Sequence, residues 1–156
     1  MKKYLLMACM MLMSTATFAQ QGSTFVGVNA NYGMHKDYKN FGLGAKVQYE
    51  FIDNWRGEAS FNYFFKKDYC TFWDVNLNLH YLFKVSDKFN VYPLAGMTLL
   101  STKVEGLDSK SKFGFNAGAG VEYSLTDKLK VNAEGKYQYV KDYDRPVISV
   151  GLSYAL

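Results

Sequence analysis

The sequence predicts an all-β protein, namely an eight-stranded antiparallel up-and-down transmembrane β-barrel. Apolar and polar residues alternate with a period of two in eight successive segments, as in strands with two different faces. Aromatic residues make up 17% of the chain, although its mean hydropathy is only −0.18. Short and long connections alternate between the segments. A barrel in lipid requires this combination, because it presents apolar and aromatic side chains outward and polar ones inward.

The N-terminus has the three parts of a cleavable signal peptide. Lys2 and Lys3 precede an apolar run from Tyr4 to Met13, and small residues follow up to Ala19. The run is about half of the roughly 20 residues that a membrane-spanning helix needs. We therefore expect Sec export to remove residues 1–19 and residues 20–156 to form the barrel domain.

The predicted strands are about as long as a tilted strand must be to cross a bilayer, roughly 9–13 residues. Their apolar faces run over residues 26–32, 41–51, 55–65, 73–83, 89–99, 113–125, 129–139 and 148–156. Phe64 is an exception, because it falls in the polar register of its segment. Pro93 lacks an N–H, so we expect a bulge or a missing hydrogen bond beside it.

The connections predict the orientation of the barrel. Three are tight turns, at residues 52–54, 86–88 and 126–128, and four are longer and charged, at residues 35–40, 67–71, 102–112 and 141–146. Barrels of the outer membrane have short periplasmic turns and longer extracellular loops. An even number of strands would then leave both termini in the periplasm.

Three stretches resemble one known family. They are residues 91–96, the glycine-rich residues 115–123, and a C-terminal pattern formed by Ser149, Gly151, Tyr154 and Leu156. Together with the leader and the eight segments, they resemble the OmpA/OmpX-like small outer-membrane barrels, and the resemblance covers about residues 20–156. It implies residence in the cell outer membrane and a C-terminal signal for the barrel-assembly machinery. The family usually ends in Phe, so Leu156 is a departure.

The inward face of the predicted barrel is charged, with the two signs near balance. Its expected lumenal network is Lys46, Glu50, Arg56, Glu58, Asp74, His80, Glu122, Lys130, Glu134 and Lys136. Glu50 and Arg56 flank one tight turn and Glu122 and Lys130 flank another, so each pair should lie opposite or diagonal across its hairpin. We interpret the network as a salt-bridged polar plug, because eight strands leave a bore that side chains fill. The alternative is a narrow, gated conductance in which these pairs exchange partners.

Enzymatic activity is not expected. Outer-membrane lipid A deacylases and acyltransferases use a His with a Ser and an acid near the outer rim. His35, Asp108, Ser109 and Ser111 lie in predicted loops but lack the His-x-Ser spacing of the deacylases. Surface residues of these types are usually only solvated, so we expect no catalytic site.

Metal, cofactor and nucleic-acid sites are not expected either. Cys70 and two distant histidines do not form a ligand cluster. Cys9 leaves with the leader, so Cys70 has no disulfide partner within the mature chain. Removal of Lys2 and Lys3 changes the net charge from +4 to +2, which is too weak and dispersed for a nucleic-acid partner.

The predicted loops carry an excess of cations: Lys36, Lys39, Lys66, Lys67, Lys103, Lys110, Lys112, Lys141 and Arg145. This excess suits the phosphates of lipopolysaccharide, but ordinary solvated loops explain it equally well. We therefore expect a monomeric protein in contact with the lipid bilayer, with a structural role in membrane integrity. The alternative is a surface recognition or adhesion protein that binds through its extracellular loops.

Overall fold

The computed structural model describes residues 23–35, 39–52, 54–67, 70–104, 106, 108–141 and 143–156. The predicted leader lies outside the described residues. The strands are β1 (Ser23–Met34), β2 (Lys39–Ile52), β3 (Trp55–Lys67), β4 (Cys70–Tyr81), β5 (Phe83–Lys84), β6 (Phe89–Val104), β7 (Lys110–Ser124), β8 (Leu129–Val140) and β9 (Arg145–Ala155). In the described residues, no helix is long and apolar enough to span a membrane.

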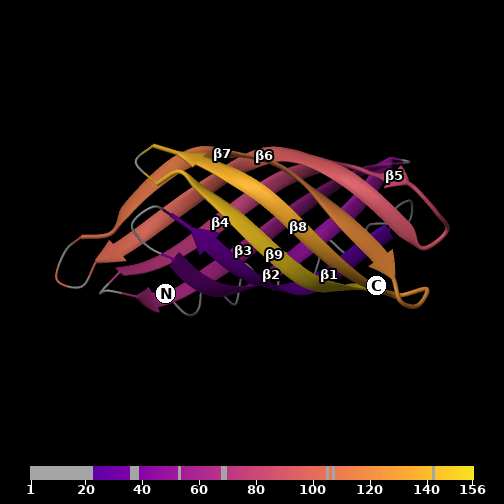
Figure 1. Ribbon diagram of the computed structural model, residues 1–156, viewed down its shortest axis with the longest axis horizontal. Coiled ribbons are helices and arrows are strands. Elements are labelled where there is room, and N and C mark those ends of the chain that lie inside the picture. Colours follow the sequence, from indigo (N-terminus) through magenta and orange to yellow (C-terminus); the bar gives the residue numbers. More distant parts are fainter. Residues whose placement is uncertain are drawn as a thin grey trace.

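The strands form one closed antiparallel sheet. β1 pairs with β2 and with β9, so the first and last strands are neighbours. The remaining pairs follow the chain, and the pairing of β4 with β6 completes the ring. The strands cross the long axis of the barrel obliquely (Figure 1), as closure of a sheet requires. The predicted fold, an eight-stranded up-and-down barrel, is confirmed when β4 and β5 are counted as one strand.

Pro93 accounts for the break between β4 and β5. The ladder of β6 with β4 ends at Leu94 and His80 and resumes in the same register at Val91 and Phe83 of β5. Pro93 lies between these two pairs, and it has no N–H to donate to the neighbouring strand. On its other side the ladder with β7 is continuous. The ladder is therefore interrupted at the place where the sequence predicts a bulge or a missing hydrogen bond.

The three predicted tight turns lie at one end of the barrel, which we call the turn end. Asn54 adopts a left-handed conformation, with φ of 70°, which asparagine tolerates better than most residues. The other two turns share one design. The hydroxyl of Ser86 accepts the N–H of Phe89 at 3.2 Å, and that of Thr126 accepts the N–H of Leu129 at 3.0 Å. The C-terminus and β5 also lie at this end, on the right in Figure 1.

The four predicted loops lie at the opposite end, which we call the loop end. They are shorter than the sequence suggested, because the strands continue past the predicted apolar faces. Residues 102–112 were expected to form one loop, but β6 runs to Val104 and β7 begins at Lys110. Cross-strand pairs such as Thr102 with Lys110 extend the ladder there. These residues are mostly polar on both faces of the sheet, so their sequence does not indicate a strand. The backbone pairing nevertheless extends β6 and β7 into this region.

The two faces of the sheet differ as the alternation predicts. On β4, Val75, Leu77 and Leu79 point outward and are 39–57% exposed. Asp74, Asn76, Asn78 and His80 lie between them, point into the lumen and are at most 5% exposed. The core of this protein is therefore mainly polar, and its apolar surface faces outward.

Candidate functional site in the barrel lumen

All ten residues of the expected lumenal network lie in the lumen. Eight of them are buried, and Glu50 and Lys130 at the turn end are half-buried. They come from β2, β3, β4, β7 and β8. Barrel closure brings these strands around one bore, so residues far apart in the sequence become partners.

The turn-end cluster consists of Glu50, Arg56, Glu122 and Lys130. Arg56 of β3 donates to Glu122 of β7 at 2.7 Å, across the bore. The amine of Lys130 lies 3.3 Å from Glu122 and 3.7 Å from Glu50. Glu50 and Arg56 are opposite in the β2–β3 ladder, as expected, but the ion pairs run to other strands instead. Charges with little exposure require such pairing.

Tyr92 of β6 separates this cluster from the middle of the lumen. Its ring stacks on His80, with ring centroids 4.6 Å apart, and the guanidinium of Arg56 lies 5.0 Å from its centroid. The Tyr92 hydroxyl donates to Glu134 at 3.0 Å and accepts from Asn132 at 3.3 Å. One aromatic residue therefore joins three strands across the bore.

A cavity of about 10 Å³, about enough for one water, lies in the middle of the lumen. It is lined by Asn29, Asn31, Lys46, Glu58, Ser60, Asn62, Asn132, Glu134, Lys136 and Ser149. Lys46 donates to Asn132 at 2.9 Å and lies 3.9 Å from Glu58. Gln48 donates to the same Glu58 at 2.6 Å. The cavity is thus bordered by both signs of charge.

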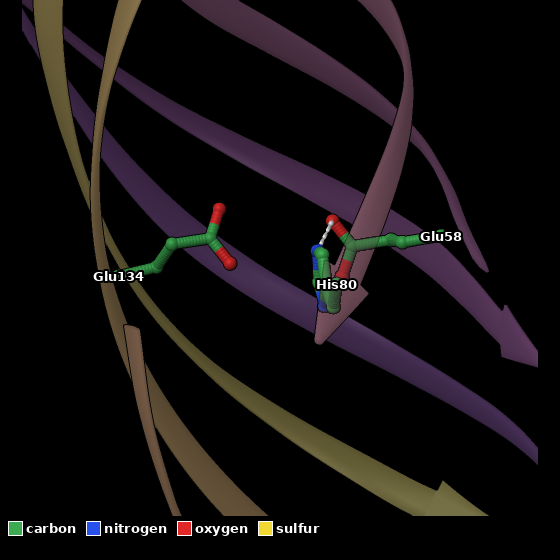
Figure 2. Close-up of side chains that lie close together, drawn as sticks. All are labelled: Glu58, His80 and Glu134. Atoms are coloured by element: carbon green, nitrogen blue, oxygen red, sulfur yellow. Dashed lines mark ion pairs between the residues drawn. The ribbon is translucent and has the colours of Figure 1, made fainter. Parts of the chain in front are cut away.

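His80, Glu58 and Glu134 form a cluster that sequence reasoning missed. Their potential ligand atoms all lie within 4.8 Å of one another. Figure 2 shows Glu134 directing its carboxylate across the lumen toward His80 and Glu58. The sequence could not indicate this cluster, because β3, β4 and β8 face one another only once the barrel closes.

The hydrogen bonds around His80 fit an ion-pair network better than a metal centre. Arg56 can only donate, and two of its nitrogens lie 3.1 and 3.3 Å from Nδ1 of His80. Nδ1 must then accept, which places the proton of a neutral imidazole on Nε2. Nε2 faces Glu58 at 3.9 Å with that proton, not with a free lone pair. Lys46 and Lys136, on the same cavity, already balance the two carboxylates.

The loop-end cluster is built on Arg145 and Asp74, which face each other from opposite sides of the barrel. They form an ion pair at 3.2 Å, and both side chains are 1% exposed. Arg145 also donates to Gln138 at 2.9 Å. Asn62 and Asn76 each donate to Asp74 at 2.7 Å. The assignment of Arg145 to the charged rim is therefore wrong: it begins β9, and its side chain enters the lumen.

Apolar side chains surround the Arg145 guanidinium at the loop end. Phe64, Phe72, Leu100, Val140 and Val147 form one buried cluster, each at most 2% exposed. The guanidinium carbon lies 4.2 Å from the ring centroid of Phe64 and 5.8 Å from that of Phe72. Phe64 was visible in the sequence as an exception to the alternation; its partners were not.

The residues considered for an enzyme-like arrangement lie at the loop end. Asp108 and Ser109 are exposed, and Ser111 donates its hydroxyl to Ser101 at 3.2 Å. The side chain of Cys70 is outside what the structure describes. Of the predicted rim cations, Lys39, Lys103, Lys110 and Lys141 are exposed. Lys36 and the side chains of Lys66 and Lys67 lie outside the described part, and Lys112 is half-buried beside the Tyr143 ring.

The predicted assembly signal divides between the two faces of β9. Ser149 and Gly151 are buried on the lumenal side, and Ser149 donates to Asn31. Tyr154 and Leu156 point outward at the turn end, where they are 49% and 69% exposed.

Comparison with protein families matches residues 5–155 to the outer membrane protein beta-barrel domain. The chain belongs to this family. A comparison with curated proteins finds no match. As a member of the outer membrane protein beta-barrel family, the chain shares the expected OmpA/OmpX-like type of small barrel.

Solved structures show the same fold at low sequence identity. The N-terminal barrel of Pseudomonas aeruginosa OprF is 18% identical, with a TM-score of 0.69 over 87% of this chain and 100% of that one. Neisserial surface protein A is 17% identical, with a TM-score of 0.69 over 85% and 96%. Ail, the attachment invasion locus protein of Yersinia pestis, is 21% identical, with a TM-score of 0.60 over 86% and 97%.

Proposed function

We propose that this protein is an integral barrel of the cell outer membrane with a structural role, and that its lumen is closed to steady ion flow. The observation that supports closure is that side chains fill the lumen. Arg56 with Glu122 and Arg145 with Asp74 bridge the bore at its two ends. The cavity between them has room for about one water. Among the residues that the structure describes, a bore filled in this way leaves room for little more than isolated water.

The proposed setting follows from the exposed surface and the resemblance. The turn end would lie in the periplasm and the loop end outside the cell, as in other barrels of this kind. Export by Sec and insertion by the barrel-assembly machinery would bring the protein there as a monomer. Exposed Lys39, Lys103, Lys110 and Lys141 would then lie at the level of lipopolysaccharide phosphates. No enzymatic activity belongs to this proposal.

Planar-bilayer recording of the purified protein tests the closed lumen. We expect rare, small openings or none, because the ion pairs of Arg56 with Glu122 and of Arg145 with Asp74 span the bore at its two ends. Large, steady, nonselective channels in the wild type would contradict the proposal and identify a porin.

Recognition through the loops is the second candidate function, and the exposed lysines at the loop end favour it. A structure of Ail with the heparin analogue sucrose octasulfate is among those with this fold; at 19% identity that likeness shows the fold alone. The discriminating variant replaces the residues between Thr102 and Lys110 with Asn-Gly, a two-residue hairpin turn. A structural role predicts unchanged membrane integrity in cells carrying the variant. Loss of binding to host cells or polyanions, with the barrel still assembled, would favour recognition.

A further inference from the structure

The inward side chains of β3 give the order of chemical environments along the bore. From the turn end to the loop end they are Arg56, Glu58, Ser60, Asn62 and Phe64. The inward face of β8 has the same two ends, with Lys130 toward the turns and Val140 toward the loops. The lumen is therefore not one uniform polar plug. It is charged toward the turns, both polar and charged around the central cavity, and apolar toward the loops, where the Arg145–Asp74 ion pair lies against the apolar cluster.

At the loop end, an apolar layer lies outside the central cavity. Its five side chains are almost fully buried, and a layer of this kind excludes water and blocks ions by dewetting. Arg145 lies against the rings of Phe64 and Phe72 and reaches across to Asp74. It therefore fills the space between the apolar layer and the polar middle of the lumen.

At the turn end, a second layer lies on the other side of the cavity. Tyr92 packs with Leu82 and Leu94 in a separate buried cluster. Its hydroxyl is held by Glu134 and Asn132, and its ring is covered by His80 and Arg56. Removal of the ring would leave a gap between the turn end and the cavity.

We propose that the lumen is closed by two seals in series, one on each side of the central cavity, with Arg145 holding the loop-end seal and Tyr92 the turn-end seal. This inference rests on the proposed closed lumen and adds how closure is achieved. Loss of one seal admits small solutes to the cavity from that side alone. Passage through the barrel requires the loss of both.

A thiol in the cavity reports on each seal separately. Cys70→Ser removes the one cysteine that follows the predicted leader, and Ser60→Cys places a thiol on the cavity wall midway along β3. In detergent, where both ends are open to solvent, a small charged methanethiosulfonate is added to the folded protein. We expect Arg145→Ala and Tyr92→Ala each to speed labelling by about tenfold or more, because labelling follows access to the thiol. Lys141→Ala, a change at an exposed rim cation, should leave the rate unchanged.

Conductance distinguishes seals in series from a single gate. Without the reporter, Arg145→Ala and Tyr92→Ala should each stay closed in planar bilayers, and the double variant should open frequently. Resistance to denaturation on unheated gels establishes that each variant has folded. If Arg145→Ala does not fold, Arg145→Lys replaces it, because it keeps the charge near Asp74 but loses the planar contact with Phe64.

Three results would overturn the inference while the closed lumen stands. The first is rapid labelling of Ser60→Cys in the otherwise unchanged barrel, and the second is no labelling in either single variant. The third is a single variant that conducts as much as the double variant. Steady conductance in the wild type would instead contradict the proposed function.

Discussion

At the scale of single residues, depth in the membrane decides the cost of a charge on the outer face. Leu77 lies mid-strand in β4, opposite Ala59 and Met97, and is 57% exposed on the outer face. Leu125 is similarly exposed, at 50%, but lies at the turn end. Leu77→Arg should lower the free energy of unfolding in vesicles by about 2–4 kcal/mol, and Leu125→Arg by about 0–1 kcal/mol. Urea titration of the refolded proteins measures both, and equal losses would mean that the two residues do not differ in depth.

The lumenal residues show which side-chain positions the sequence could predict. The alternation along each strand was enough to place Arg56 and Glu122 in the lumen, because successive side chains point to opposite faces of the sheet. The alternation did not predict that Arg56 binds Glu122, since β3 and β7 meet across the bore only after the ring closes. The sequence does not place Arg145 inside, because the charged residues 141–146 resemble one loop. The predicted last strand therefore begins later in the chain than β9 does.

At the scale of elements, strand existence was predictable and strand length was not. Alternation of apolar and polar residues indicates each lipid-facing strand. Pro93 indicates the break between β4 and β5. Beyond the apolar band the alternation ends, because neither face of the sheet needs apolar residues there. Backbone pairing nevertheless continues, as the pairs of Cys70 with Val104 and Thr102 with Lys110 show.

The C-terminal end of the last strand presents two apolar side chains on the outer face of the barrel. Tyr154 near the end of β9 and Leu156 just after it point outward. We expect the assembly machinery to recognise them, and we expect the fold itself not to need them. Tyr154→Ala with Leu156→Ala should lower the amount of barrel in the outer membrane several-fold, whereas refolding into detergent should persist. Ile148→Ala with Val150→Ala is the control, because it removes apolar surface from the same face of the same strand. Equal assembly defects in both double variants would contradict a terminal signal.

At the scale of the whole molecule, the polar interior and the apolar exterior have one cause. A bilayer offers no hydrogen bonds, so a closed sheet satisfies its backbone internally and directs its apolar side chains toward lipid. Polar side chains can then occupy the bore only if they bind one another. The turn-end cluster, the group around His80 and Glu58, and the loop-end cluster of Arg145 and Asp74 are all held together in this way. The alternation and the aromatic content of the sequence predicted this polar interior and apolar exterior, which is the reverse of the arrangement in a water-soluble protein. It could not predict the two seals, because each depends on side chains from strands that are distant in the chain.

The height of the apolar band predicts which bilayers stabilise the barrel most. On the strand formed by β4 and β5 the band runs from Trp73 to Phe83, and Trp73 and Tyr81 are aromatic residues of the kind that mark membrane interfaces. Ten residue steps span about 34 Å along the strand, and a tilt of about 40° reduces this to about 26 Å along the membrane normal. This height is less than the roughly 30 Å core of a typical bilayer, so thick bilayers must thin around the protein at a free-energy cost. We expect the free energy of unfolding to fall as acyl chains lengthen from 12 to 18 carbons, measured by urea titration in vesicles of a single phosphatidylcholine. Equal or greater stability in the thickest vesicles would mean that the apolar band extends beyond Trp73 and Phe83.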